Sequence, residues 1–87
     1  MQISRNYVLR TIAGDILLVP LGGSSTETKG MILLNEMSLF VYESIRNGQT
    51  EEQILSHILD EYDVEASQAA ADLSEIISEF TKLGIIE

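Results

Sequence analysis

The sequence predicts an α+β fold in which three antiparallel strands come first and three helices follow. Two patterns indicate this order. The first third of the chain holds short runs of β-forming residues between turn signals, and the rest shows apolar residues at helical spacing between capping residues. The chain has 87 residues, which is the size of one small domain. We therefore expect a single domain over residues 1–87.

The strands are predicted from three apolar runs. Residues 7–11 and 15–19 are rich in β-forming side chains, and Gly14 between them can take the positive φ of a tight hairpin. Residues 21–30 are polar and glycine-rich without any period, so we expect a flexible loop there. Residues 31–34 form the third predicted strand.

The helices are predicted from their caps. Asn35 can accept hydrogen bonds from the free amides of a first helix, and Gly48 can close that helix in a left-handed conformation. Thr50, with a glutamine three residues later, fits the capping box of a second helix. A third helix is expected over residues 66–83, before Gly84.

Each helix carries apolar residues three and four positions apart, which predicts one buried face per helix. We expect these faces to form the core together with the strands. The predicted buried residues are Met37, Phe40, Val41, Ser44 and Ile45 in the first helix, Ile54, Leu55, Ile58, Leu59 and Tyr62 in the second, and Ala69, Ala70, Leu73, Ile76, Ile77, Phe80 and Leu83 in the third.

The charge balance argues against nucleic acid and membrane surfaces as partners. Fourteen acidic residues against five basic ones give a net charge of −9. Phosphate binding needs clustered cations, whereas the basic residues are scattered along the chain as Arg5, Arg10, Lys29, Arg46 and Lys82. An anionic membrane surface is disfavoured for the same reason, and no run of about 18 apolar residues could span a bilayer.

Few residues are available for catalysis. The chain has no cysteine and one histidine, which excludes thiolate zinc sites, cysteine nucleophiles and multi-histidine metal sites. No motif of nucleophile and carboxylate surrounds His57, so we expect it to be a surface or half-buried helix residue. Carboxylates are dense between residues 51 and 65 but lack the spacing of a calcium loop. We predict a protein without catalytic activity, metal or cofactor.

The N-terminus and the cysteine content predict a cytoplasmic protein. The first residues lack the apolar stretch and the small-residue cleavage site of a signal peptide. A chain without cysteine forms no disulfide, which favours a reducing compartment.

Two of the predicted strands are apolar at consecutive positions. Residues 16–19 and 31–34 are unbroken apolar runs, and successive strand side chains point to opposite faces, so both faces of the sheet are predicted to be hydrophobic. Three short helices can hardly cover both faces and every edge. Either residues 21–30 or the N-terminal residues fold over the remaining face, or that face and an unpaired strand edge form an association site.

The order of three strands and three capped helices is that of a winged helix-turn-helix-like domain. Recognisable segments follow one another along nearly the whole chain, namely Tyr7-Val8-Leu9-Arg10, Ala13-Gly14-Asp15, Leu34-Asn35-Glu36, Gly48, Thr50-Glu51-Glu52, Tyr62-Asp63-Val64, Asp72-Leu73 and Leu83-Gly84-Ile85-Ile86. In these segments the chain resembles the PqqD-like family, named for pyrroloquinoline quinone synthesis protein D. Two positions depart from the family's pattern: Tyr42, where tryptophan is frequent, and Ser38, where glycine is common.

This resemblance implies a RiPP recognition element, a non-catalytic domain that binds the leader of a ribosomally synthesised precursor peptide and presents it to a modifying enzyme. In such domains the leader adds as a strand on the third strand and lies in the cleft against the third helix. The implied partners are the leader peptide and an enzyme such as a radical enzyme, a cyclase, a peptidase or a kinase, without any cofactor. By position, the implied site residues are Met31, Ile32, Leu33 and Leu34 at the edge, and Ala69, Leu73, Ile76, Ile77 and Phe80 in the cleft.

Two other functions fit the same predicted fold. A structural or regulatory winged-helix subunit would form a homodimer through its apolar sheet face. A DNA-binding regulator would need a basic last helix, but this helix carries Asp72, Glu75 and Glu79. Light scattering separates the dimer from a leader-binding protein, because a dimer that buries the third-strand edge leaves no place for a leader strand.

Overall fold

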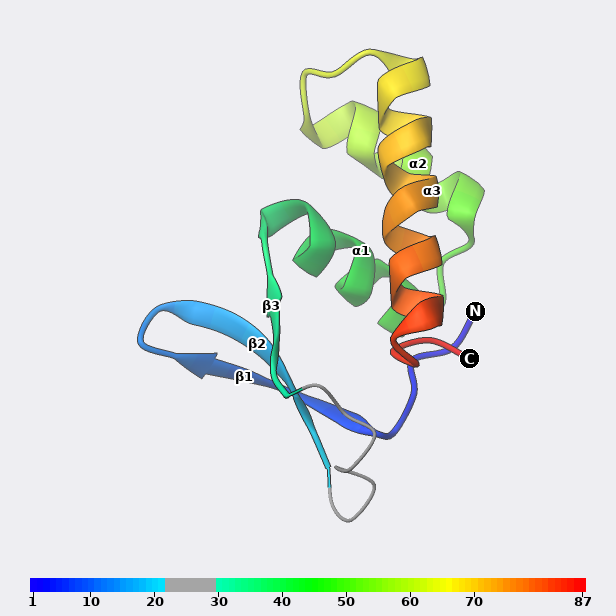
Figure 1. Ribbon diagram of the computed structural model, residues 1–87. Coiled ribbons are helices and arrows are strands. Elements are labelled where there is room, and N and C mark those ends of the chain that lie inside the picture. Colours follow the sequence, from blue (N-terminus) through cyan, green and yellow to red (C-terminus); the bar gives the residue numbers. More distant parts are fainter. Residues whose placement is uncertain (22–29) are drawn as a thin grey trace.

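A computed structural model describes residues 1–21 and 30–87 of the chain. In these residues three strands are followed by three helices, so the predicted winged helix-turn-helix-like α+β fold is confirmed (Figure 1). The elements are β1 (Tyr7–Ile12), β2 (Asp15–Pro20), β3 (Ile32–Leu34), α1 (Glu36–Arg46), α2 (Glu51–Glu61) and α3 (Ala66–Lys82). The loop predicted over residues 21–30 lies largely outside the described residues.

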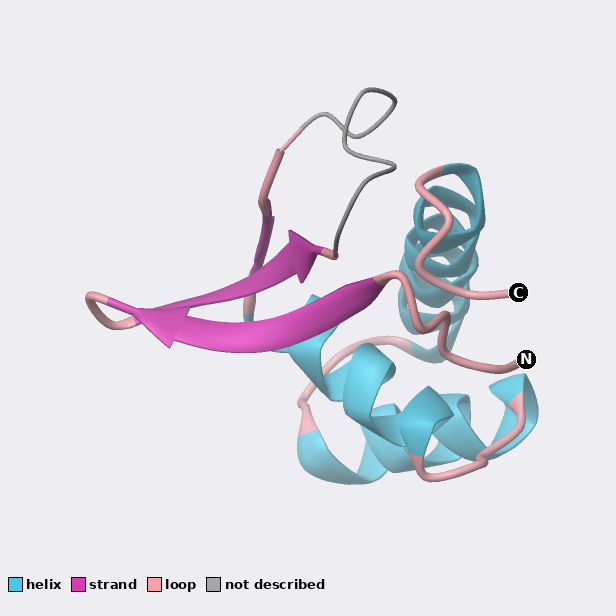
Figure 2. Cartoon of the chain, turned by 90° about the horizontal axis from the view of Figure 1, so that it is seen from below, coloured by secondary structure: helices cyan, strands magenta, loops and turns pink. Residues whose placement is uncertain are grey.

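The sheet is antiparallel and has the order β1-β2-β3. Gly14 has the positive φ expected of the hairpin turn, at 86°, and Ala13 before it also has a positive φ, at 53°. Positive φ at both central residues defines a two-residue turn whose twist matches that of the flanking strands. The hairpin of β1 and β2 extends away from the helices (Figure 2).

The predicted helix caps are all formed. The Asn35 side chain accepts from the Ser38 amide at 2.8 Å, and Thr50 forms a complete capping box with Gln53. Gly48 and Gly84 follow α1 and α3 with φ values of 83° and 76°, as left-handed C-terminal caps require. In the part of the chain that the structure describes, no helix combines the length and the apolar character needed to cross a membrane.

One hydrophobic core joins the inner face of the sheet to the three helices. It includes most of the predicted stripe residues, and Tyr42, which the stripe did not include, is also buried. Three predicted core residues are exposed instead, namely Leu59, Ala70 and Leu83. Each lies at the border of its apolar stripe, where helical spacing still assigns it to the stripe but the neighbouring elements no longer cover it. The buried apolar residues are Leu18, Leu34, Val41, Tyr42, Ile45, Ile54, Ile58, Ala69, Leu73, Phe80, Ile85 and Ile86.

The two ends of the chain lie side by side next to the last turn of α3 (Figure 1). Ile3 and Ile86 form an isolated antiparallel bridge, and the Ser4 amide donates to the Ile85 carbonyl at 2.7 Å. The Tyr7 hydroxyl donates to the Leu83 carbonyl at 2.8 Å. These contacts attach the first strand of the sheet to the end of α3.

Candidate functional site

The outer edge of β3 is the starting point for the site. β3 follows β2 in the sheet order, and in the described residues no strand pairs with its other side. An unpaired strand edge presents backbone amides and carbonyls that can bind another extended chain. The described residues thus contain the unpaired edge of one of the two alternatives left open by the sequence. The other alternative, a cover formed by residues 21–30, lies largely outside the described residues.

The register determines which β3 residue directs its backbone to this edge. In a two-residue hairpin the residues flanking the turn, here Ile12 and Asp15, form a hydrogen-bonded pair, and such pairs alternate along the ladder. The Leu21 amide bonds the Asn6 carbonyl at 2.8 Å, which agrees with this alternation. The odd-numbered residues of β2 therefore bond β1, and the even-numbered ones bond β3.

This alternation leaves Leu33 with its backbone groups on the open side. Ile16 pairs with Leu34 and Leu18 pairs with Ile32, and these pairs are the hydrogen-bonded ones. Leu33 lies between them in a pair without hydrogen bonds, so its amide and carbonyl point away from β2. Leu33 is the β3 residue that can bond a further strand.

The side chains of β3 alternate between the two faces of the sheet. Leu34 is buried and Ile32 packs against the core, whereas Leu33 is 63% exposed. Leu17 lies opposite Leu33 on the same outer face. The outer face also includes half-buried Val8 and Val19, which do not belong to the core cluster. Both faces are therefore apolar, as the consecutive apolar residues predicted.

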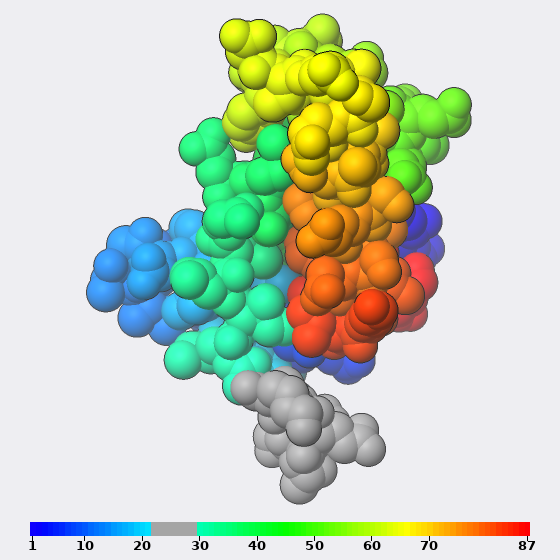
Figure 3. Space-filling model, turned by 45° about the horizontal axis from the view of Figure 1, so that its top comes forward, coloured from blue at the N-terminus to red at the C-terminus, as the bar shows by residue number. Residues whose placement is uncertain are grey.

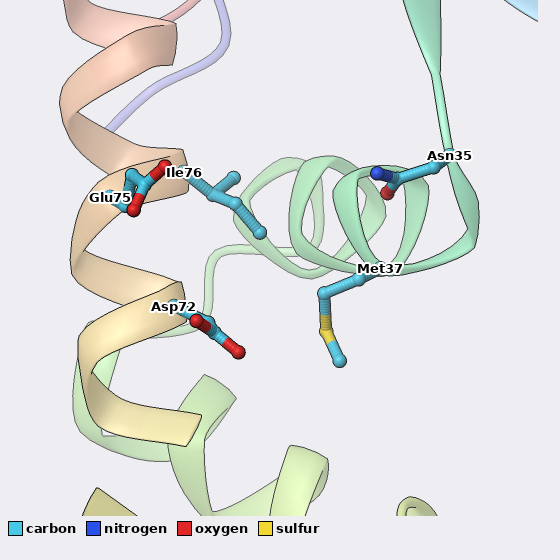
Figure 4. Close-up of a pocket in the computed structure, with 5 residues that line it drawn as sticks. All are labelled: Asn35, Met37, Asp72, Glu75 and Ile76. Atoms are coloured by element: carbon cyan, nitrogen blue, oxygen red, sulfur yellow. The ribbon is translucent and has the colours of Figure 1, made fainter. Parts of the chain in front are cut away.

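A groove runs between the start of α1 and the middle of α3. Its lining residues are Asn35, Met37, Asp72, Glu75 and Ile76, and its volume is about 210 Å³. In Figure 4, Ile76 and Asp72 extend from α3 toward α1, and Met37 projects into the same space. Figure 3 shows the surfaces of α1 and α3 next to one another on this face. Asn35 directly follows β3, so the groove continues from the end of the free edge.

The predicted site residues fall into two groups. Leu34, Ala69, Leu73 and Phe80 are buried in the core, with exposures of 6% or less, and present almost no surface to a ligand. The accessible ones are Met31, Ile32, Leu33, Ile76 and Ile77. Of these, Ile76 lines the groove, whereas Ile77 packs on the core without lining it.

Sequence reasoning missed four of the five groove residues as site residues, namely the polar Asn35, Asp72 and Glu75, and Met37, which it assigned to the core. Asp72 and Glu75 lie on the same side of α3 as Ile76, at the helical spacing that places neighbours on one face. Asn35 was interpreted only as a helix cap, which it is, but it also lines the groove. The sequence did contain a signal for the acidic residues. Asp72 and Glu75 lie four and one positions before Ile76, an apolar residue at the border of its helical stripe.

The described residues contain no group of three or more His, Asp or Glu side chains that could hold a metal ion. His57 is exposed on α2, and its Nδ1 lies 2.9 Å from the Gln49 side-chain oxygen. The predicted surface position of His57 is thus confirmed. The polar groups of the groove lining are two carboxylates and an amide, and the lining contains no serine, threonine, lysine or histidine.

The fold and the site define a small α+β domain with an unpaired strand edge beside a groove. A family model described as coenzyme PQQ synthesis protein D (PqqD) matches residues 24–86, and the chain belongs to this family. Comparison of the sequence with curated proteins gave no match.

Two solved structures have the same fold. One is described as TbiB1 in complex with the TbiA(beta) leader peptide; it is 23% identical, with a TM-score of 0.82 over 100% of this chain and 95% of that chain. The other is a lasso peptide synthetase B1 complexed with the leader peptide; it is 15% identical, with a TM-score of 0.82 over 99% of this chain and 95% of that chain. These alignments include the β1–β2 hairpin, which precedes the segment matched by the family model.

Proposed function

We propose that this protein is a RiPP recognition element, which binds the leader of a ribosomally synthesised precursor peptide and presents it to a modifying enzyme. The observation that carries the proposal is the backbone of Leu33, which points to an edge where no described strand pairs. A leader segment in extended conformation would add there as a fourth strand, with main-chain hydrogen bonds supplying affinity.

The dimensions of the groove support a peptide as ligand. Its volume of about 210 Å³ is smaller than the roughly 300–1,000 Å³ of pockets that enclose a small molecule. A space of this size holds one or two side chains. Because it begins beside the end of β3, a strand bonded to Leu33 would direct alternate side chains toward it.

Membership of the PqqD family and the fold shared with two leader-bound proteins agree with this function. We propose further that the domain is not itself catalytic, since the residues that line the groove include no serine, threonine, lysine or histidine beside the two carboxylates. The reaction would then belong to a partner enzyme that receives the bound precursor. Replacing His57 with alanine should leave product formation unchanged in a reconstituted pathway.

The proposal is tested by searching near the gene for a short precursor peptide and titrating the ¹⁵N-labelled protein with the synthetic leader of that precursor. We expect micromolar or tighter binding, with amide shifts concentrated in β3 and on the side of α3 that faces the groove. Shifts confined to α2, with β3 unaffected, would show that a different surface binds the peptide. Absence of any binding would refute the function.

A further inference from the structure

The groove beside β3 combines an apolar floor with a negative rim. Ile76 and Met37 supply apolar surface, and Asp72 and Glu75 supply two carboxylates from α3. Glu79 continues the acidic side of α3 by one more turn. Whatever occupies the groove must therefore meet both hydrocarbon and negative charge.

Nothing in the described part of the chain neutralises this charge. The ion pair found there joins Arg46 to Glu43 at 2.6 Å, on α1 and outside the groove lining. Asp72 accepts a hydrogen bond from the side-chain amide of Gln68 (Nε2) at 2.8 Å, which orients its carboxylate but leaves its charge in place. The whole protein carries a net charge of −9, so distant groups add to the negative potential.

The geometry of strand addition determines which leader side chains reach the groove. A leader residue opposite Leu33 would point to the outer face, as Leu33 itself does. Its two neighbours in the leader would then point to the helices, because side chains alternate along a strand. One of these two leader residues would lie level with Ile32 and the other level with Leu34. Leu34 directly precedes Asn35, which lines the groove, so the second leader residue would be next to the groove.

We propose that the groove selects leaders that carry a lysine or arginine two positions from an apolar residue, with the cation held by Asp72 and Glu75. This inference rests on the proposed function. The aliphatic part of the basic side chain would lie along Met37 and Ile76, while its charged end remains partly hydrated near the carboxylates. The apolar residue would pack level with Ile32.

A random peptide library displayed on phage tests the inference without knowledge of the natural precursor. Selection on the wild-type protein should enrich peptides that carry a lysine or arginine two positions away from an apolar residue. Selection on the double variant Asp72→Asn, Glu75→Gln should retain the apolar position and lose the basic one. A matched control, Asp60→Asn with Glu61→Gln, removes the same charge from the exposed end of α2 and should give the wild-type result.

A selected peptide, made synthetically, then gives the size of the effect. The groove variant should bind it about three- to tenfold more weakly than wild type, as expected for two solvent-exposed ion pairs, and with a smaller salt dependence. Thermal melts of both variants should match wild type. If selection on the double variant Asp72→Asn, Glu75→Gln enriches basic residues as strongly as selection on wild type, the inference is overturned. It is also overturned if selection on wild type enriches no basic residue. Neither result overturns the proposed function. If no selected peptide binds at β3, the proposed function itself is overturned.

Discussion

Leu33 lies opposite Leu17 in the β2–β3 ladder as a pair without hydrogen bonds, so its amide and carbonyl face the open edge of the sheet. Its side chain is 63% exposed on the outer face. The backbone and the side chain of this residue therefore face different surroundings. The backbone is available to an added strand, and the side chain is available to a molecule on the outer face.

The first prediction concerns proline at two neighbouring positions of β3. Leu33→Pro removes an amide that bonds nothing in the described fold, so the melting temperature should change little and leader affinity should fall about three- to tenfold. Ile32→Pro removes an amide that bonds β2, so its main effect should be on stability. Calorimetric titration beside a thermal melt checks both variants. Equal leader affinity of Leu33→Pro and wild type would contradict strand addition at this edge.

The second prediction separates the groove from the core. Ile76→Ser removes apolar surface from the groove and should weaken leader binding about fivefold, which corresponds to about 1 kcal/mol of lost burial. Ile77→Ser is the matched control, because Ile77 is also half-buried on α3 but does not line the groove. Both variants should lose similar stability in a melt. If both also lose similar leader affinity, the groove is not the contact surface.

The parts of the fold that were predictable from sequence are those with local causes. Asn35, Thr50, Gly48 and Gly84 act on amides and carbonyls within a few residues of themselves, so their roles are visible in the sequence. The bridge between Ile3 and Ile86 is not visible in this way. It depends on where α3 ends relative to β1, which tertiary packing decides.

The site was predictable to a similar extent. The two-sided apolar strands indicated an edge and an exposed face as one of two alternatives, and the described residues contain both features. The helical stripe could not distinguish Leu73, which is buried, from Ile76, which borders the groove, because both follow the same apolar spacing. That distinction depends on where α1 crosses α3. The acidic residues of the groove were interpreted only as charges that disfavour DNA.

The third prediction concerns the contact that joins the two ends of the chain. Tyr7→Phe removes the hydrogen bond from the Tyr7 hydroxyl to the Leu83 carbonyl and keeps the ring. Because this bond is partly exposed to solvent, its loss should cost about 0.5–1 kcal/mol, which lowers the melting temperature by roughly 2–8 °C for a domain of this size. Hydrogen exchange of the Ser4 amide, which bonds Ile85, should accelerate. Unchanged exchange at Ser4 would show that the termini hold together without Tyr7.

The fourth prediction is a loss of stability at alkaline pH. Burial raises the pKa of Tyr42 above its ordinary value of about 10, an effect that the nearby Arg46 cation partly offsets. The folded state therefore holds this proton more tightly than the unfolded state. The stabilisation is complete below pH 10 and is lost as the pH rises through the folded pKa.

Tyr42→Phe should therefore flatten the decline of melting temperature above about pH 10. A residual decline is expected, because burial and the neighbouring Glu36 also raise the pKa of Tyr62. Thermal melts at closely spaced pH values provide the measurement. Parallel curves for the variant and wild type would mean that Tyr42 contributes nothing to the alkaline loss.

The last prediction is that the protein is a monomer at micromolar concentrations and binds one leader per chain. The described strands contain six, six and three residues, and about half of them face outward. A stable interface of standard size needs about 20–30 residues from each partner, so the outer sheet face is too small to hold a homodimer by itself. Light scattering with and without the leader measures the stoichiometry. A dimer that dissociates when leader is added would mean that two copies pair through the Leu33 edge, whereas a dimer that excludes the leader would favour a structural subunit over a recognition element.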